Sequence, residues 1–205
     1  MPSRSSSIDR PMNAISCLLR LGATLTVLGT LSMQVAAAEL RSVDVWIEDG
    51  RYHLISESLL KAGQDALYAV LTDYDQFKKF TSAIVASENV EPDEEGRPQF
   101  YTRMQGCVLV YCKTFVRRGY LLLTPKHDIT AMADPETSDF EFSRERWRLS
   151  DEDGGTVMIY EFELEPRFWI PPFVGPYYLK RALKSGSIRA VDRIEALARG
   201  ETPKR

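Results

Sequence analysis

The sequence predicts an α+β domain in which a curved antiparallel sheet of about six to eight strands wraps around one long C-terminal helix. Three observations predict it. Residues 83–164 form a run of strand-like segments separated by turn signals, and residues 63–80 carry apolar side chains at helical steps. Residues 177–199 form a single amphipathic helix. This order of elements is typical of a sheet with its helices gathered on one face.

Residues 1–38 have the composition of a secretory signal peptide. Arginines and small polar residues precede an apolar run over residues 21–31, and Ala36 and Ala38 provide the small residues of a cleavage site. The apolar run is too short to span a bilayer comfortably, which disfavours the alternative of an uncleaved anchor. We therefore expect the remaining chain, from residue 39, to act outside the cytoplasm.

A hairpin is predicted at the start of this remaining chain. Residues 43–48 alternate between apolar and polar side chains, and residues 51–57 resume an extended pattern. Asp49-Gly50 between them is a strong signal for a tight turn. The two segments should therefore pair directly.

Two short helices and then a meander should follow the hairpin. The helical pattern of residues 63–80 is interrupted at Asp73 and Asp75, either of which can cap a second helix. The strands expected after it are residues 84–90, 100–107, 112–123, 126–133, 140–149 and 156–164. Prolines then interrupt regular structure from residue 166 to 176, before the closing helix, and residues 201–205 read as a tail.

Cys107 and Cys112 are the two cysteines outside the leader, and four residues separate them. A short connection between antiparallel strands would bring their sulfur atoms together, which permits a disulfide in an oxidising compartment. The alternative is two small buried thiols. A zinc site is disfavoured because the spacing is wrong and His53 and His127 are the only histidines.

Several short motifs resemble one protein family. They are residues 71–77 (LTDYDQF) with Phe80, 147–149 (WRL), 155–160 (GTVMIY) and 165–172, which begins Glu-Pro and ends Ile-Pro-Pro. Together they resemble bacterial members of the START-like helix-grip (SRPBCC) superfamily, closest to its polyketide cyclase/dehydrase and coenzyme Q-binding lipid-transport family. The resemblance covers about residues 55–200. It implies a helix-grip domain over residues 39–200 and a pocket for a lipid or isoprenoid quinone between the sheet and the last helix.

The apolar face of the last strands and of the closing helix is the candidate ligand site. Its residues are Trp147, Leu149, Met158, Tyr160, Phe162, Leu164, Leu183, Ala190 and Ile194. The same residues could instead fill a solid core, and the sequence leaves both readings open.

Charged residues on the strands read as solvated surface. Glu145 and Glu163 could act as an acid/base pair, but we expect both to face water. Arg144, Arg146 and Arg148 should form an exposed stripe, unless a bulge turns one of them into the pocket.

A catalytic motif is missing from the sequence. There is no nucleophile elbow and no Gly-rich phosphate loop, and His53 and His127 read as exposed or satisfied side chains. We expect a non-enzymatic binder with no cofactor and no metal. The alternatives are a cyclase- or hydrolase-type enzyme using the same cavity, or a ligand-free interaction module.

The aromatic segment before the closing helix is a candidate for membrane contact, because cations follow it directly. The candidate residues are Phe168, Trp169, Phe173, Lys180, Arg181 and Lys184. The alternative is a rigid elbow between the last strand and the helix. The net charge of −3, from 26 Lys and Arg against 29 Asp and Glu, gives no general reason to expect nucleic acid. We expect a monomer, and the leader predicts that it acts in the bacterial periplasm.

Overall fold

The computed structural model describes residues 38–108, 111–170 and 175–203. The expected leader, residues 1–38, falls outside this part of the chain except for Ala38. The described residues form eight strands, two α-helices and one 3-10 helix, which confirms the predicted α+β class. The strands are β1 (Glu39–Glu48), β2 (Arg51–Leu60), β3 (Ile84–Val90), β4 (Gln99–Val108), β5 (Tyr111–Thr124), β6 (Asp128–Ala133), β7 (Phe140–Glu152) and β8 (Gly155–Pro166). The helices are α1 (Gln64–Thr72), η1 (Tyr74–Lys79) and α2 (Gly175–Ala198).

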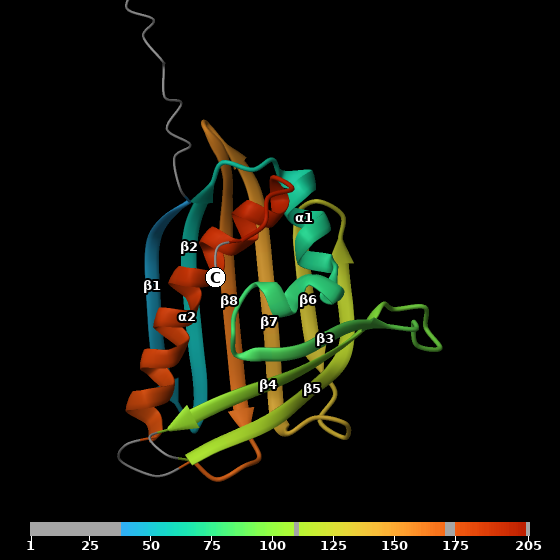
Figure 1. The fold of residues 1–205 in the computed structure, drawn as a ribbon. Helices are drawn as coiled ribbons and strands as arrows, with labels where there is room; N and C mark the ends of the chain where they lie inside the picture. Colours follow the sequence, from blue (N-terminus) through green and yellow to red (C-terminus); the bar gives the residue numbers. More distant parts are fainter. Residues whose placement is uncertain (1–37, 109–110, 171–174, 204–205) are drawn as a thin grey trace, which may run out of the picture. The chain divides into compact units, whose positions relative to one another are not determined.

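The eight strands form one antiparallel sheet in the order β1-β2-β8-β7-β6-β5-β4-β3. From β3 to β8 each strand pairs with its neighbour in sequence, as in the predicted meander. The N-terminal hairpin joins the other edge, where β2 pairs with β8 from Tyr52 opposite Leu164 to Leu60 opposite Thr156. Figure 1 shows β3, β4 and β5 turning across the direction of β2, β8 and β7, so the sheet is curved.

Local sequence signals set the ends of the elements. The turn between β1 and β2 places both Asp49 and Gly50 at positive φ, 48° and 81°, which suits a tight hairpin turn. Between the two short helices, the Asp73 carboxylate accepts a hydrogen bond from the backbone N–H of Asp75, at 3.1 Å. The predicted hairpin and the predicted helix break are both confirmed.

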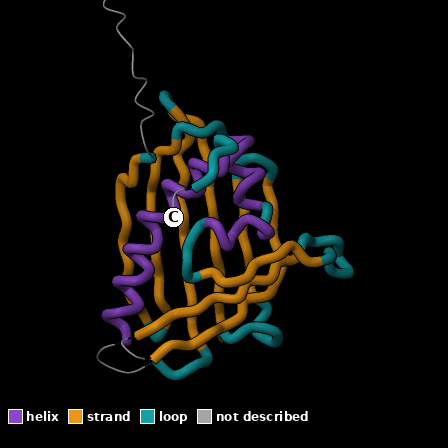
Figure 2. Tube along the Cα trace, viewed as in Figure 1, coloured by secondary structure: helices purple, strands orange, loops and turns teal. Residues whose placement is uncertain are grey.

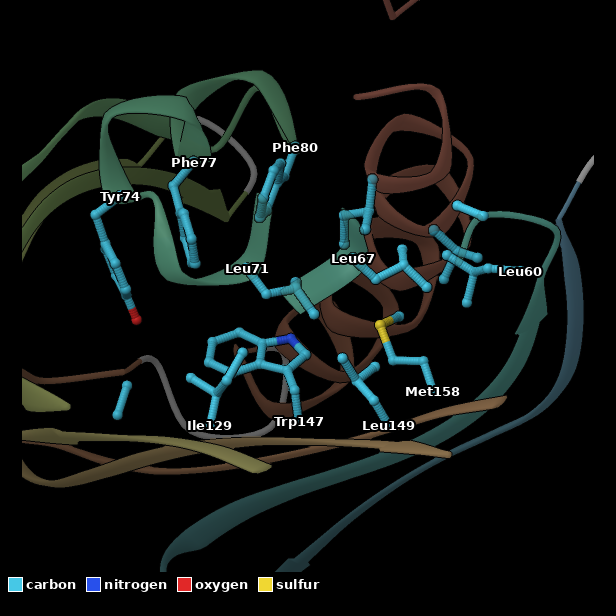
Figure 3. Close-up of a cluster of buried hydrophobic side chains, with 14 of the residues drawn as sticks. Leu60, Leu67, Leu71, Tyr74, Phe77, Phe80, Ile129, Trp147, Leu149 and Met158 are labelled. Atoms are coloured by element: carbon cyan, nitrogen blue, oxygen red, sulfur yellow. The ribbon is translucent and has the colours of Figure 1, made fainter. Parts of the chain in front are cut away.

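All three helices lie on the same side of the sheet (Figures 1 and 2). The inward-facing side chains of the strands pack against them in two buried clusters. The larger cluster brings α1 and η1 onto the sheet: Phe77 stacks on Tyr74 at 3.8 Å and meets Trp147 edge-on at 5.9 Å between ring centroids (Figure 3). The smaller cluster joins β1, β2 and β8 to the first turns of α2 through Leu179 and Leu183.

Candidate functional site

A cavity of about 300 Å³ lies between the concave face of the sheet and α2. Strands β2, β4, β5, β7 and β8 form its wall, η1 and the residues after it close one side, and α2 covers it. Residues from both buried clusters line it, and Tyr160 packs against both clusters. A cavity of this volume is at the lower end of the range of small-molecule sites.

Strand alternation and helix period explain why the lining is mainly apolar. Met158, Tyr160 and Phe162 lie two residues apart on β8, so their side chains share the concave face. Leu183, Gly186, Ala190 and Ile194 recur at steps of three and four on α2, so one stripe of the helix faces the same space.

The structure gathers eight of the nine predicted ligand residues around this cavity. They are Trp147, Met158, Tyr160, Phe162, Leu164, Leu183, Ala190 and Ile194. Leu149 is the exception, because it is buried in the larger core cluster and does not reach the cavity. Leu149 lies one step beyond Trp147 on the same strand face and packs in the core there, which is the filled-core alternative that the sequence left open for these residues.

The expectation that Glu145 faces water was wrong. Glu145 is buried, lines the cavity and forms an ion pair with Arg117, with 3.0 Å between Nη1 and Oε1. The Arg117 side chain is only 2% exposed, and its Nε donates to Ser143 Oγ at 2.8 Å. Its guanidinium lies between two aromatic rings, 5.5 Å from the centroid of Phe100 and 5.3 Å from that of Phe162.

The alternation of the strands could have revealed both residues. Glu145 has the same parity on β7 as the buried Trp147, and Arg117 has the same parity on β5 as the buried Leu121. A charged side chain in an inward position needs a partner, and each of these two supplies the other's. Glu145 was expected to face water although Trp147, two residues along the same strand, was expected in the cavity, and Arg117 carried no prediction.

Two tyrosines lie beside this pair. The hydroxyl of Tyr160, a cavity residue, donates to Glu145 Oε1 at 3.2 Å. Burial raises the pKa of both Tyr160 and the fully buried Tyr74 well above the usual tyrosine range, and the Glu145 carboxylate raises it further. Burial alone would lower the pKa of Arg117, but Glu145 and the tyrosines more than offset that effect. The tyrosines therefore stay neutral and the arginine stays charged.

The opposite face of the same strands carries the exposed stripe that alternation predicts. Arg144 pairs with Glu163, Arg146 with Asp128 at 2.7 Å, and Arg148 with Glu161 at 2.5 Å. Glu163 therefore lies across the sheet from Glu145, and the two do not form an acid/base pair. No bulge turns these arginines inward, and the interpretation of a solvated stripe is confirmed.

The end of the cavity near the start of α2 is its mouth, defined here by residues 168–170, Tyr178, Leu179 and the tip of the β4–β5 hairpin. Trp169 and Tyr177 are 67% and 63% exposed there. Phe168 packs on Phe115 at 5.4 Å between ring centroids and is half-buried. Among the candidate membrane residues, Phe173 lies outside the described residues.

The β4–β5 hairpin tip carries the two cysteines on one wall of the mouth. Cys107 and Cys112 are directly opposite each other, and their sulfur atoms lie 2.05 Å apart. Cys107 and Lys113 line the cavity, and the Lys113 ammonium lies 5.0 Å from the centre of the Phe168 ring. The arrangement is that of a disulfide, and its formation in the native compartment stays a prediction.

In the described part of the chain, the histidines lie away from the cavity and no metal-binding group is found. His53 stacks on Trp46 at 5.0 Å, and His127 is hydrogen-bonded to the Gln64 amide, so neither faces the cavity. Within residues 38–203, apart from the gaps given above, no three His, Cys, Asp or Glu side chains gather in a metal-binding group. None of the helices described is sufficiently long and apolar to cross a bilayer.

Comparison with solved structures supports the fold. The Zhui aromatase/cyclase from Streptomyces sp. R1128 is 16% identical, with 73% of this chain and 94% of that chain covered at a TM-score of 0.56. A STAR-related lipid transfer protein from Xanthomonas axonopodis is also 16% identical, with 77% and 98% covered at 0.56. Human STARD10 is 11% identical, with 77% and 75% covered at 0.56. These likenesses place the chain in the START-like helix-grip fold.

The sequence itself identifies the family. No curated protein sequence matches the chain. The family described as polyketide cyclase/dehydrase and lipid transport matches residues 60–176, from the end of β2 to the start of α2. This match takes in η1, the whole meander and the strands that carry Glu145 and Arg117, and it covers more than half of the chain. The chain therefore belongs to the polyketide cyclase/dehydrase and lipid transport family.

Proposed function

We propose that this protein binds a hydrophobic small molecule, such as a lipid or an isoprenoid quinone, in the cavity under α2 and carries it in the bacterial periplasm. The cavity carries the proposal, because about 300 Å³ of space is lined mainly by aliphatic and aromatic side chains. Removing apolar ligand surface from water contributes roughly 25 cal/mol per Å². A ligand-free interaction module would have no use for this space.

The first test is to find what the protein holds. Protein expressed with its leader and purified without detergent is analysed by native mass spectrometry, and its bound molecules are extracted and identified. We expect a lipid-like molecule at a stoichiometry near one. Purified protein should also take up the neutral fluorophore N-phenyl-1-naphthylamine. Protein that is always empty and takes up no fluorophore would overturn the proposal.

Exposed aromatic rings and cations at the mouth support contact with an anionic bilayer during loading and release. Trp169 and Tyr177 project beside the mouth, and Lys180, Arg181 and Lys184 follow on α2, which carries no acidic residue in its first turn. Aromatic rings favour the membrane interface, and cations are attracted to anionic headgroups. The arginines of the outer sheet face differ, since Arg144, Arg146 and Arg148 are each paired with a carboxylate.

Vesicle sedimentation tests this contact. We expect binding to phosphatidylglycerol vesicles that weakens as salt is added, and little binding to phosphatidylcholine vesicles. The variant Trp169→Ala should bind less, whereas Trp46→Ala, on the outer face of β1, should bind like the unchanged protein. Equal binding by both variants would overturn the contact site.

A second candidate function is catalysis on an apolar substrate in the same cavity. The observation that favours it is the convergence of Glu145 and Tyr160 on the cavity wall, since a carboxylate and a phenol can move a proton between them. The molecules extracted from the unchanged protein and from Glu145→Gln distinguish the two functions. Two molecules related by one chemical conversion, with the unconverted form only in the variant, favour catalysis, whereas the same molecule or molecules that no single reaction connects favour carriage.

A further inference from the structure

We propose that the buried Arg117–Glu145 pair selects a ligand that carries one neutral hydroxyl group, held head-first against Glu145 and Tyr160. This inference rests on the proposed function and names the chemical class of its ligand. The cavity wall has few charged side chains. Among the described lining residues, only Glu145 and Lys113 carry charge, and Lys113 belongs to the hairpin tip at the mouth.

The inner part of the wall therefore has no net charge, because the Glu145 carboxylate is neutralised by Arg117 directly behind it. A ligand with a carboxylate or an ammonium head would place a third charge beside this pair. Burying an uncompensated charge is strongly unfavourable, whereas a neutral head adds no charge. The wall thus discriminates against charged heads.

The wall is also a hydrogen-bond acceptor. An ionised carboxylate can only accept, and Tyr160 already directs its proton to Glu145, which leaves its oxygen lone pairs free to accept. Arg117 does not line the cavity. The Ser56 hydroxyl and the Trp147 indole N–H do, on the strands that flank Tyr160, and both can donate. A ligand hydroxyl both donates and accepts, so it can use more of these groups than a ketone or an ether, which only accept.

Two atoms of the pair have unused hydrogen-bonding capacity. Oε2 of Glu145 and Nη2 of Arg117 are buried without a hydrogen-bond partner in the described structure. Such groups are rare in folded proteins, and those attached to charged side chains are the least favourable. Both atoms are enclosed by protein, so a ligand hydroxyl reaches Oε2 only when the Glu145 side chain turns toward the cavity.

The experiment displaces bound N-phenyl-1-naphthylamine with three ligands of equal chain length: dodecanol, its methyl ether and dodecanoate. We expect dodecanol to displace the fluorophore at a concentration about ten-fold lower than either of the others, because a hydrogen bond to a charged partner is lost in the ether and charge is buried with the acid. Equal displacement by all three overturns this inference and leaves the proposed function standing. A fluorophore that never binds overturns the proposed function instead.

Two cavity variants test which residues cause the preference for dodecanol. Glu145→Gln leaves Arg117 without its carboxylate, so the order should reverse in favour of dodecanoate. Tyr160→Phe keeps the charge pair, so dodecanol should lose part of its advantage while dodecanoate stays weak. Glu163→Gln, which makes the same chemical change on the outer face, is the matched control and should keep the original order. An unchanged order in both cavity variants overturns the assignment to this pair.

Discussion

Two buried charged residues differ most from what their residue types would predict. Glutamate and arginine usually lie at the surface, yet Glu145 and Arg117 occupy inward positions of β7 and β5 and meet inside the domain. The cavity wall is mainly apolar, and Glu145 is the member of the pair that adds polarity to it. Stability and ligand choice should both respond to the pair.

Removing one member of the pair should be strongly destabilising. Arg117→Met leaves the Glu145 carboxylate buried without its counter-charge, and we expect the free energy of unfolding to fall by about 3–5 kcal/mol. The double variant Arg117→Met with Glu145→Leu removes both charges and should recover most of that loss. Urea denaturation measures both. A single variant as stable as the unchanged protein would show that the pair is hydrated.

Tyr74 gives the opposite prediction, because its buried hydroxyl has no hydrogen-bond partner in the described structure. We expect Tyr74→Phe to raise the free energy of unfolding by about 1 kcal/mol at neutral pH.

The raised pKa of Tyr74 adds a pH dependence. Above about pH 10 the unfolded state loses a phenolic proton that the folded state keeps, so the free energy of unfolding falls as pH rises. Tyr74→Phe should make this fall shallower in denaturation curves measured at pH 8 to 11, whereas the exposed Tyr177→Phe should not.

The β4–β5 hairpin stands out among the elements because its tip has no neighbouring strand. β3 pairs with β4 only as far as Met104, and β6 pairs with β5 only from Gly119, so the tip is a two-stranded ribbon. Such ribbons are marginally stable alone, and this one forms part of the cavity mouth. The Cys107–Cys112 link crosses the tip and closes a very short loop, so its effect should be local.

Reduction of this link should therefore speed ligand release more than it weakens the fold. Dithiothreitol supplies two electrons and two protons, which convert the disulfide to two thiols. We expect the fluorophore to leave about ten-fold faster after reduction, and equally fast from the double Cys→Ser variant, in stopped-flow transfer to vesicles. Leu67→Ala, a buried change in α1 away from the cavity, is the control that lowers stability without opening the mouth. Release at the same rate before and after reduction would contradict the prediction.

The elements themselves were largely predictable because their signals are local. Alternation located the strands, the Asp49-Gly50 turn located the first hairpin, and the stripe on residues 177–199 located α2, which begins at Gly175. The pairing of β2 with β8 came from no local signal, since it joins segments a hundred residues apart.

At the scale of the whole molecule, the cavity could not be read from the sequence. The same apolar side chains serve in a filled core and in a hollow one, as Leu149 and Trp147 show by lying two residues apart on one face with different outcomes. Whether space remains depends on how far the curved sheet stands from α2. Small residues at the helix surface, Gly186 and Ala190, contribute to that distance.

Filling the cavity should abolish binding without unfolding the domain. Ala190→Phe places a large side chain in the space under α2, and we expect at least about a ten-fold loss of fluorophore affinity with little change in the melting temperature. Ile188→Phe, on the exposed side of the same helix, should change neither. Isothermal titration and thermal denaturation provide the two readouts. Full affinity in Ala190→Phe would mean that the ligand lies elsewhere.

The pairing of the first hairpin with the last strand also has a consequence for the order of folding. β1 and β2 gain their neighbour only when residues 155–166 are available, and the helix that covers them comes later still. During synthesis, the N-terminal hairpin must therefore wait, unpartnered, for nearly the whole chain. A polypeptide whose sheet closes only at the end of synthesis therefore stays incompletely folded until almost all of its residues have been made.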